Sequence, residues 1–281
     1  MDNYCLMGNP VEHSKSPWIQ NRFAELTGEP LHYDKRLVPL DGFAAALQAF
    51  RDQGGKGCNI TVPFKLQAAA LATEASPRVA LAGACNTLRL DGDQVLADNT
   101  DGVGLINDIT HNAGVALAGR DVLLIGAGGA GAGVLGPLLE QRPRRVVLAN
   151  RTVARAQEVA ARHAALAAQQ GVTLVACGLQ DAAVTGAGFD VVINASSSSL
   201  KGAGVPVPAS VLRPGALACD LMYGPAAQGF MDWAAAHGAV PRDGLGMLVE
   251  QAAEAFRIWR GVRPPSATVL AELREKLAAA A

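Results

Sequence analysis

The feature that most constrains the fold is a regular alternation, from about residue 120 onward, of short β-rich runs with alanine-rich helical runs. Such an alternation is typical of a parallel sheet joined by crossover helices. The β-rich runs are almost entirely apolar, as expected for strands covered by helices on both faces. The predicted strands are 121–126, 145–150, 172–177, 190–195 and 216–221, with helices at 130–140, 153–169 and 226–237. We therefore expect a doubly wound nucleotide-binding domain.

The first hundred residues show a less regular α/β pattern, and the chain ends in two further helical runs. The length of 281 residues favours two domains. Strand-like runs are expected at 1–8, 32–39 and 57–63, and helices at 17–28, 42–53, 245–260 and 266–280. The predicted fold class is α/β with two domains. A substrate-binding domain covers 1–101, a Rossmann-like domain covers 102–238, and C-terminal helices at 239–281 return to the first domain.

Composition and charge argue for a small-molecule partner and against a polymer or a membrane. The net charge of -1 leaves no basic excess to neutralise nucleic-acid phosphates. The uncharged stretch 122–139 contains six glycines and Pro137, which do not suit a membrane-spanning helix. The amino terminus lacks the pattern of a secretory signal, and the five cysteines are scattered. We expect a cytoplasmic protein with reduced thiols and no metal site, either a monomer or a homodimer.

A glycine-rich segment follows the first strand of the predicted nucleotide-binding domain. Its residues are Gly126, Ala127, Gly128, Gly129, Ala130 and Gly131, which match G-x-G-x-x-G between a strand and a helix. Glycines there allow a tight turn and a close approach to a pyrophosphate, which the helix N-terminus favours. In a chain with 31 glycines, the alternative is a flexible turn.

The end of the next strand indicates which dinucleotide is preferred. Asn150, Arg151 and Thr152 stand where an NAD-binding protein places a carboxylate, and Arg155 follows one helical turn later. Two guanidiniums can bind a 2′-phosphate bidentately. Alternatively, the arginines are solvated charges and Thr152 is a plain N-cap. Together with the glycine loop, these residues favour NADP(H).

Hydroxyl groups stand at the start of the first predicted helix. Ser14 and Ser16 precede Pro17, and Ser16 as N-cap with proline at the first helical position is a common helix start. Hydroxyls and free N–H groups at a helix start also suit a carboxylate ligand.

The strand-like run 57–63 is expected to place Asn59 and Thr61 on one face and the apolar Ile60 and Val62 on the other. Two neutral hydrogen-bonding groups on one face suit a polyol. Lys65 follows this run, but a lone lysine is usually a solvated charge. Asp101, in the loop 98–102, could simply cap the helix that follows.

Seven segments, taken together, resemble the shikimate dehydrogenase family in its own order. They are GNPVEHSKSP (8–17), NITVPFK (59–65), GACNT (83–87), DNTDGVG (98–104), GAGGAG (126–131), NRT (150–152) and GLGMLVEQAA (244–253). The resemblance implies two domains with the active site in the cleft between them. It also implies reversible NADPH-dependent reduction of 3-dehydroshikimate to shikimate, within chorismate and aromatic amino-acid biosynthesis.

The resemblance also assigns roles to single residues. Lys65 and Asp101 would be the catalytic pair, and either could transfer the proton. Ser14, Ser16, Thr61, Asn86 and Gln251 would bind the substrate, with Asn59 lining the pocket and Tyr223 near the substrate. Asn194, Ser196, Met222, Gly244 and Met247 would contact the cofactor. Gln251 has independent support, because it lies on an otherwise apolar helical stripe with Met247, Leu248, Ala255 and Ile258.

The sequence departs from the family pattern at three places, and two other functions remain as alternatives. Gln20 stands in place of a common histidine, Ser196 in place of a common threonine, and the run 197–200 lacks an expected glycine. One alternative is a quinate/shikimate dehydrogenase that uses NAD or NADP. Another is a non-catalytic protein that senses NADP or shikimate, although such a protein would be expected to lack Lys65 or Asp101.

Overall fold

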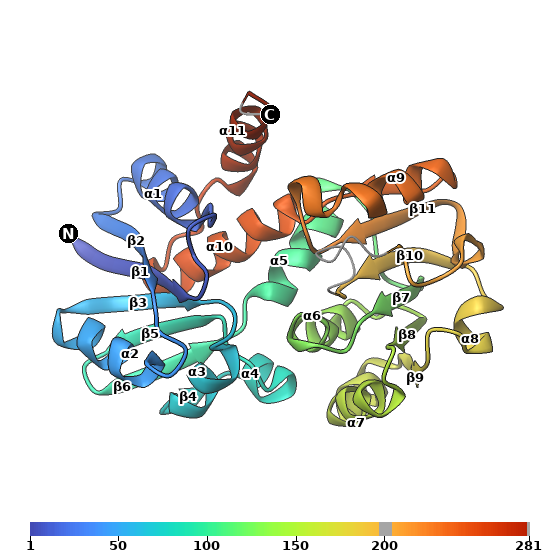
Figure 1. Ribbon diagram of the computed structural model, residues 1–281, viewed down its shortest axis with the longest axis horizontal. Coiled ribbons are helices and arrows are strands. Elements are labelled where there is room, and N and C mark those ends of the chain that lie inside the picture. The colour runs from blue at the N-terminus through green and yellow to red at the C-terminus, as the bar shows by residue number, and fades with distance from the viewer. Residues whose placement is uncertain (197–203, 280–281) are drawn as a thin grey trace. The chain divides into compact units, whose positions relative to one another are not determined.

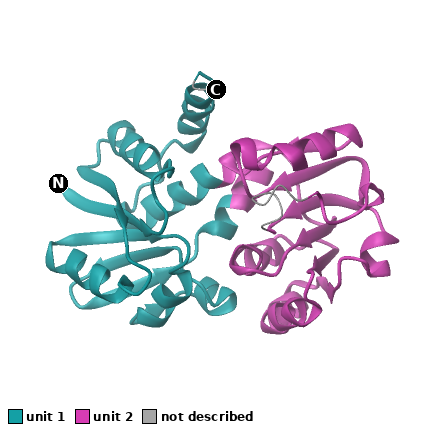
Figure 2. Ribbon diagram, viewed as in Figure 1, with its two compact units in different colours: residues 1–104, 248–281 teal, residues 105–247 magenta. Residues whose placement is uncertain are grey.

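The computed structural model describes residues 1–196 and 204–279, which form an α/β protein with two six-stranded sheets. Two compact units are present (Figure 2): unit 1 contains Met1–Gly104 and Leu248–Ala281, and unit 2 contains Leu105–Met247. The chain passes between the units within helices α5 (Asp101–Asn107) and α10 (Leu245–Arg260). No helix in the described ranges is both long and apolar enough to span a membrane.

Unit 2 contains the predicted parallel sheet, with all five predicted strands present (Figure 1). The strand order is β12-β11-β10-β7-β8-β9, and every neighbouring pair is parallel. The strands are β7 (Asp121–Ile125), β8 (Arg145–Ala149), β9 (Thr173–Cys177), β10 (Phe189–Asn194), β11 (Leu212–Asp220) and β12 (Val240–Arg242). The helices are α6 (Gly129–Glu140), α7 (Val153–Gln170), α8 (Ala182–Thr185) and α9 (Gln228–Ala236), with a π-helix at Asp108–Asn112 and 3-10 turns at Ala209–Val211 and Gly224–Ala226.

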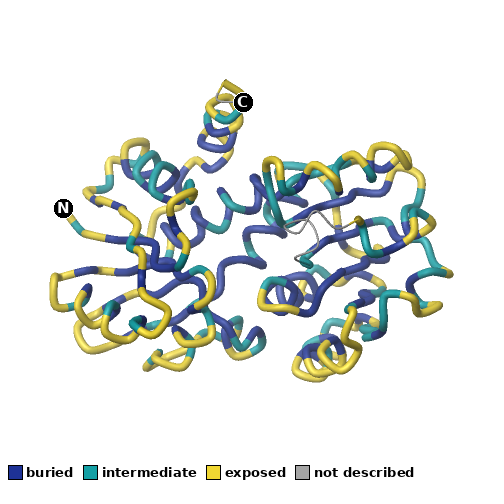
Figure 3. The backbone as a smooth tube through the Cα atoms, viewed as in Figure 1, coloured by how far each residue is buried: buried dark blue, intermediate teal, exposed yellow. Residues whose placement is uncertain are grey.

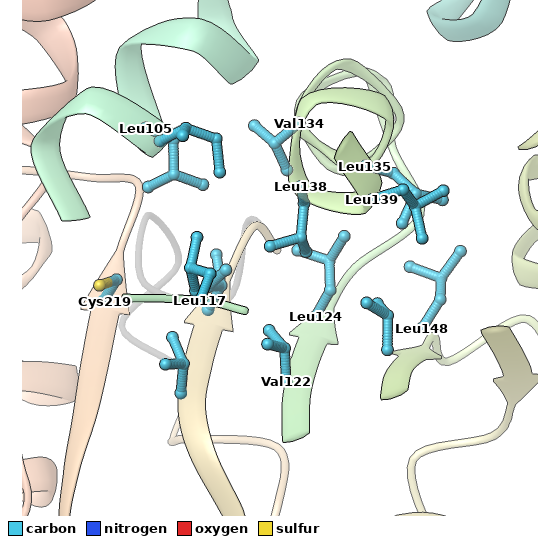
Figure 4. Close-up of a cluster of buried hydrophobic side chains, with 14 of the residues drawn as sticks. Leu105, Leu117, Val122, Leu124, Val134, Leu135, Leu138, Leu139, Leu148 and Cys219 are labelled. Atoms are coloured by element: carbon cyan, nitrogen blue, oxygen red, sulfur yellow. The ribbon is translucent and has the colours of Figure 1, made fainter. Parts of the chain in front are cut away.

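Helices on both faces of this sheet explain why its strands are apolar throughout. Val122 and Leu124 of β7 belong to one buried cluster, with Val134 and Leu138 of α6 (Figure 4). The alternate residues Leu123 and Ile125 belong to the cluster on the opposite face. Because successive side chains of a strand point to opposite faces, every position of β7 is buried (Figure 3).

Unit 1 is built on a mixed sheet with strand order β2-β1-β3-β5-β6-β4. Its strands are β1 (Asp2–Gly8), β2 (Leu31–Leu37), β3 (Gly55–Ile60), β4 (Glu74–Ala75), β5 (Thr87–Asp91) and β6 (Gln94–Asp98). Its helices are α1 (Ser16–Thr27), α2 (Phe43–Asp52), α3 (Lys65–Leu71), α4 (Pro77–Ala82) and α11 (Ser266–Ala278), with parts of α5 and α10. The β5–β6 hairpin was not predicted, although the Asp-Gly-Asp turn at 91–93 is a hairpin signal.

The C-terminal helices are anchored to the sheet of unit 1. Trp259 of α10 donates its indole N–H to the carbonyl of Leu88 at 3.0 Å and makes a tilted ring contact with Tyr4, with ring centroids 4.7 Å apart. Phe256 makes an edge-on contact with Phe23 of α1. α10 therefore forms part of the core of unit 1, which fixes where its polar side chains lie.

The buried histidine of α7 gives a pH-dependent prediction. His163 is fully buried, its Nδ1 bonds the carbonyl of Val159 at 2.8 Å, and its Nε2 has no partner among the described residues. Burial lowers its pKa below the ordinary 6.5, so the unfolded chain binds the proton more tightly. Well above pH 6.5 the imidazole is neutral in both the folded and the unfolded chain, so the free energy of unfolding carries no protonation penalty there. We expect this free energy to decline at lower pH, by at most about 1.4 kcal/mol per pH unit.

Urea unfolding at pH 7.5 and pH 5.5 checks this prediction. His163→Phe should lose less stability between the two pH values than the wild type does. His237→Phe is the matched control, because His237 makes the same type of bond, to the carbonyl of Trp233 at 2.7 Å, but is exposed. An equal loss of stability in the wild type and in His163→Phe would contradict the assignment.

Candidate active site

The glycine-rich turn of unit 2 joins the end of β7 to the start of α6, as the sequence predicts. Gly126 has φ +105°, and an added Cβ would lie 2.9 Å from the backbone of Ala195. A Cβ on Gly131 would lie 2.0 Å from the carbonyl oxygen of Gly126. In contrast, no atom of the described residues lies within 4 Å of a Cβ added at Gly128 or Gly129, and no described side chain caps α6. Gly126 and Gly131 are therefore required by the shape of the turn. At Gly128 and Gly129 the backbone stays accessible to a ligand.

The end of β8 supports this turn and presents two cations. Asn150 accepts a hydrogen bond from the backbone N–H of Ala127 at 3.1 Å and donates to the carbonyl of Thr152 at 2.9 Å. Thr152 is the N-cap residue of α7, without a side-chain cap bond. Arg151 and Arg155 are exposed, and neither guanidinium has a hydrogen bond or an ion pair within 1–196 and 204–279. Asn150 therefore holds the loop, while the two arginines remain free to bind an anion.

The ends of β10 and β11 form a second polar group in unit 2. Asn194 is buried, donates to Asp220 at 3.0 Å and accepts from the hydroxyl of Ser196 at 2.7 Å. Asp220 in turn accepts from the backbone N–H of Met222 at 2.9 Å, and the N–H of Gly244 donates to the carbonyl of Met222 at 2.8 Å. The predicted residues Asn194, Ser196, Met222 and Gly244 are thus joined by Asp220, which the sequence analysis did not select. Residues 197–200 lie outside the described residues.

An ion pair anchors the segment that follows β12. Arg242 donates from Nε and Nη2 to both carboxylate oxygens of Asp108, at 2.6 and 2.5 Å, and Asp108 is almost fully buried. A Cβ on Gly246 would lie 1.8 Å from Asp108 Oδ1, so only glycine fits against this carboxylate. Met247 lies next in the chain, buried in the core of unit 2. This pair was not predicted, because nothing in the spacing of residues 108 and 242 indicates it.

The predicted lysine and carboxylate meet in unit 1. Lys65 Nζ lies 2.5 Å from Asp101 Oδ2, and the other carboxylate oxygen accepts from the amide of Asn86 at 2.8 Å. Lys65 begins α3, where Phe64 before it is buried and stacked on Phe43, with ring centroids 5.1 Å apart. The pair is mostly enclosed, with 24% of the lysine side chain and 10% of the aspartate side chain exposed. Two residues that are each ordinary surface charges in isolation therefore form one organised ion pair.

The loop that carries Asp101 is held by its own polar contacts. Asn99 accepts from the N–H of Asp101 at 3.1 Å and donates to the carbonyl of Ala84 at 2.9 Å. Arg78 binds both oxygens of Asp98, at 2.9 and 2.6 Å. Burial by itself raises the pKa of Asp98, but the Arg78 guanidinium outweighs burial and lowers it. This loop is therefore fixed independently of any ligand.

Asn86 is the centre of the polar network in unit 1. Its amide N–H₂ lies within hydrogen-bonding distance of Asp101, of Thr100 at 3.0 Å and of Gln251 Oε1 at 3.2 Å. Its side-chain oxygen accepts from the N–H of Thr100 at 2.8 Å and from the hydroxyl of Thr87 at 2.9 Å. Gln251 therefore does turn toward this network from α10. Thr100 and Thr87 were not selected from the sequence.

Asn59 is occupied by protein contacts. It is buried, accepts from the hydroxyl of Tyr33 at 2.9 Å and donates to Thr87 at 3.0 Å. Burial raises the pKa of Tyr33 well above its ordinary value, so the phenol remains a donor at neutral pH.

The hydroxyls of Ser16 and Thr61 are free, in contrast to the two asparagines. Neither side chain makes a hydrogen bond in the part of the chain that the structure describes. The prediction that Ser16 is an N-cap was wrong: Lys15 already has helical angles and precedes the first helical residue, Ser16. Ser14 instead accepts from the N–H of Ser16 at 3.2 Å. Both free hydroxyls are therefore available to a ligand.

The expectation that Ile60 and Val62 share the apolar face of a strand was also wrong. Ile60 is buried in the core of unit 1, but Val62 is 60% exposed. β3 ends at Ile60, and the Val62–Pro63 peptide is cis, so the strand alternation does not continue past residue 60.

Sheet register places the polar residues of unit 1 at one edge. β1 and β3 run parallel and end at Gly8 and Ile60. β5 runs antiparallel to both β3 and β6, with Thr87 opposite Asn59 and Asp98. The polar residues lie near these strand ends: Ser14 and Ser16 follow β1, Thr61 and Lys65 follow β3, Asn86 precedes β5, and Asp101 follows β6. Tyr223, the remaining predicted substrate residue, lies in unit 2, where burial raises its pKa.

The fold and the polar groups together define a two-unit, pyridine-nucleotide-dependent dehydrogenase. Family models match the chain at residues 6–88 (shikimate dehydrogenase substrate binding domain), 108–201 (shikimate / quinate 5-dehydrogenase) and 244–274 (shikimate 5'-dehydrogenase C-terminal domain). The shikimate dehydrogenase (NADP(+)) of Acidovorax sp. strain JS42 is 69% identical over 280 residues, covering 100% of this chain and 98% of the relative. The chain belongs to the shikimate dehydrogenase family.

Similar solved structures support the assignment to this family. An Ael1 enzyme from Pseudomonas putida has a TM-score of 0.89 and 43% identity, covering 97% of this chain and 98% of its own. The shikimate 5-dehydrogenase of Thermus thermophilus, in complex with NADP(H) and shikimate, has a TM-score of 0.84 and 30% identity, covering 98% of this chain and 99% of its own.

Proposed function

We propose that this protein catalyses the reversible NADPH-dependent reduction of 3-dehydroshikimate to shikimate. The observation that carries the proposal is the Lys65–Asp101 pair, held by Asn86 at a sheet edge that also presents free hydroxyls. The family assignment supports the substrate, and cytoplasmic location is part of the proposal. The five cysteines are all free and buried, which is compatible with a reducing compartment.

We assign proton transfer to Lys65. Reduction of a ketone produces an alkoxide that must receive a proton, and NADPH supplies the hydride. Both carboxylate oxygens of Asp101 already accept hydrogen bonds, from Lys65 and from Asn86, which is the pattern of an ionised acceptor. The Lys65 ammonium has three N–H groups and donates one of them to Asp101. It can therefore give a proton to the substrate oxygen while Asp101 holds it in place.

The substrate's carboxylate and hydroxyls are assigned to the free polar groups of unit 1. Ser14, Ser16 and Thr61 would receive the carboxylate and neighbouring ring hydroxyls. Gln251 would present its amide N–H₂, which in the described structure donates only to the carbonyl of Leu248 at 3.1 Å. Asn86 and Asn59 would act by fixing Asp101, Thr87 and Gln251, since their own amides are already bonded. We also assign Tyr223, a residue of unit 2, to substrate binding.

The residues of unit 2 fit NADP(H). The open backbone at Gly128 and Gly129 would receive the pyrophosphate, and Arg151 and Arg155 the 2′-phosphate. Met222, Gly244 and Met247 would line the nicotinamide, on a segment held by Asp220 and by the Asp108–Arg242 pair.

Two glycine variants should separate the structural and binding roles of the turn. In Gly131→Ala the new methyl meets the backbone oxygen of Gly126, so we expect a loss of roughly 1–3 kcal/mol in the free energy of unfolding. Gly129→Ala adds its methyl to open space, so we expect normal stability but weaker NADPH binding. Thermal unfolding and a fluorescence titration with NADPH measure both effects. Unchanged NADPH affinity in Gly129→Ala would argue against pyrophosphate binding at this turn.

Product analysis tests the proposed reaction. Purified protein is incubated with 3-dehydroshikimate and NADPH, and the product is identified by proton NMR while NADPH absorbance is followed. We expect shikimate to form in a 1:1 ratio with NADPH consumed, and a Lys65→Met preparation to show little turnover. NADPH consumption without shikimate, or no consumption, would refute the proposal.

A further inference from the structure

Unit 2 contains a pocket at the edge of its sheet opposite the glycine-rich turn. Since all its strands are parallel, the strand starts share one edge, where Asp121, Arg145 and Thr173 are neighbours in register. The glycine-rich turn follows the other end of β7. The pocket has a volume of about 410 Å³ and is lined by Asp121, Arg144, Arg145, Thr173, Ala187, Gly188 and Arg213. We call it the basal arginine pocket.

Positive charge exceeds negative charge at this pocket. The ion pairs around it join four arginines (Arg120, Arg144, Arg145 and Arg213) to two aspartates (Asp121 and Asp190). The chain as a whole has a net charge of -1, so this excess is local. Asp121, the only carboxylate lining the described pocket, has a side chain that is 1% exposed. Its charge is covered by arginines and does not face an incoming ligand.

The arginines of the pocket differ in how many of their guanidinium N–H groups are hydrogen-bonded. Arg144 donates to both oxygens of Asp121, and Arg213 binds Asp121 and Asp190, each at 2.7 Å. The Arg145 guanidinium makes no hydrogen bond within the described ranges, because its Nη2 lies 3.6 Å from Asp121. Its Nε is buried without a partner, and its guanidinium lies over the Phe189 ring, 5.2 Å from the centroid. The Nη groups, and not the enclosed Nε, are therefore the donors of Arg145 that a ligand can reach, since 28% of this side chain is exposed.

We propose that the basal arginine pocket binds a phosphate monoester, with Arg145 as its principal ligand. An ester dianion balances the excess of two positive charges, and the fixed fork of a guanidinium suits phosphate oxygens. The exposed hydroxyl of Thr173 supplies a further donor. The volume is within the range of small-molecule sites and leaves room for an organic group beside the phosphate. This site is separate from Arg151 and Arg155, which follow the opposite end of β8.

Isothermal titration with glycerol 3-phosphate tests the proposal. The full-length protein is saturated with NADP+ so that the cofactor's phosphate site is filled, and ionic strength is kept constant with chloride. We expect saturable binding at one site and at least tenfold weaker binding by Arg145→Met. Arg142→Ala is the control, because Arg142 is an exposed arginine in the loop just before β8 and bonds Gln170, which does not line the pocket. It should retain the wild-type affinity.

A second variant and two other ligands make the test specific. Thr173→Val, an exposed isosteric change, should weaken binding severalfold, so the proposal can be judged even if Arg145→Met folds poorly. Glycerol should not bind, and succinate should bind more weakly than the phosphate ester. The proposal is overturned if the wild type shows no saturable binding, or if Arg142→Ala loses as much affinity as Arg145→Met. Binding of succinate as tight as that of the phosphate ester would overturn the assignment to phosphate.

Discussion

Lys65→Met is expected to lower kcat for shikimate oxidation by about 10²- to 10⁴-fold, the usual scale for loss of an acid–base group. The KM for shikimate should change much less, because Ser16, Thr61 and Gln251 remain to bind the substrate. The methionine side chain keeps the length and apolar stem of lysine but removes every donor. Steady-state kinetics with thermal unfolding as a check on folding measure the effect.

Two further variants make this result interpretable. Lys56→Met is the matched control, since Lys56 is an exposed lysine at the start of β3 and should leave kcat unchanged. Asp101→Asn should also lower kcat, but less than Lys65→Met, if the carboxylate orients the ammonium and does not itself transfer the proton. A normal kcat in Lys65→Met would remove the lysine from the mechanism. A near-normal Lys65→Met with an inactive Asp101→Asn would assign the proton to the aspartate.

Replacement of Arg151 or Arg155 by alanine should lower kcat/KM for NADP+ by about 10- to 100-fold each. The range follows from roughly 1.5–3 kcal/mol for a hydrogen bond to a charged group, with about 1.4 kcal/mol per factor of ten. The same variants should use NAD+ as well as the wild type does, because NAD+ has no 2′-phosphate.

Arg162→Ala provides the comparison for this pair. Arg162 is an exposed arginine farther along α7, so its loss changes the net charge equally without affecting the end of β8. Equal losses with NADP+ and NAD+ in Arg151→Ala would mean that the arginine supports the fold or the pyrophosphate, and not cofactor choice.

Local sequence patterns predicted five of the six strands in the sheet of unit 2. Its central strands are apolar because both of their faces are buried, and that signal is visible in single runs such as 121–126. β12 was missed because it has only three residues and contains Pro241. In unit 1 only β1, β2 and β3 were predicted, and β3 ends earlier than expected, at Ile60. β4, β5 and β6 were not predicted, because they have only two to five residues and give little periodic signal.

The site residues fall into those with a local signal and those without one. Gly126, Arg151 and Ser14 stand at strand or helix ends, where chemistry can be read from neighbouring residues. Asn86 reaches Thr100 and Asp101 only because the antiparallel β5–β6 hairpin places the start of β5 beside the end of β6. Asp220 had an unused signal, since a carboxylate closing an apolar strand needs a buried partner.

The pairing of Asp108 with Arg242 depends on tertiary structure. The two residues are 134 positions apart in the chain and meet through the packing of unit 2. No local pattern marks either of them, and the same holds for the contact between Gly246 and Asp108. Such long-range contacts can be identified from the three-dimensional structure but not from the spacing of residues in the sequence.

A steady-state comparison of shikimate and quinate, each with NADP+ and with NAD+, tests the proposed function most directly. In the proposed function, the free hydroxyls of Ser16 and Thr61 and the Lys65–Asp101 pair would bind and oxidise shikimate. The exposed Arg151 and Arg155 would bind the 2′-phosphate of NADP+. We therefore expect the highest kcat/KM for shikimate with NADP+. The highest kcat/KM for quinate with NAD+ would contradict both the substrate and the cofactor assignment.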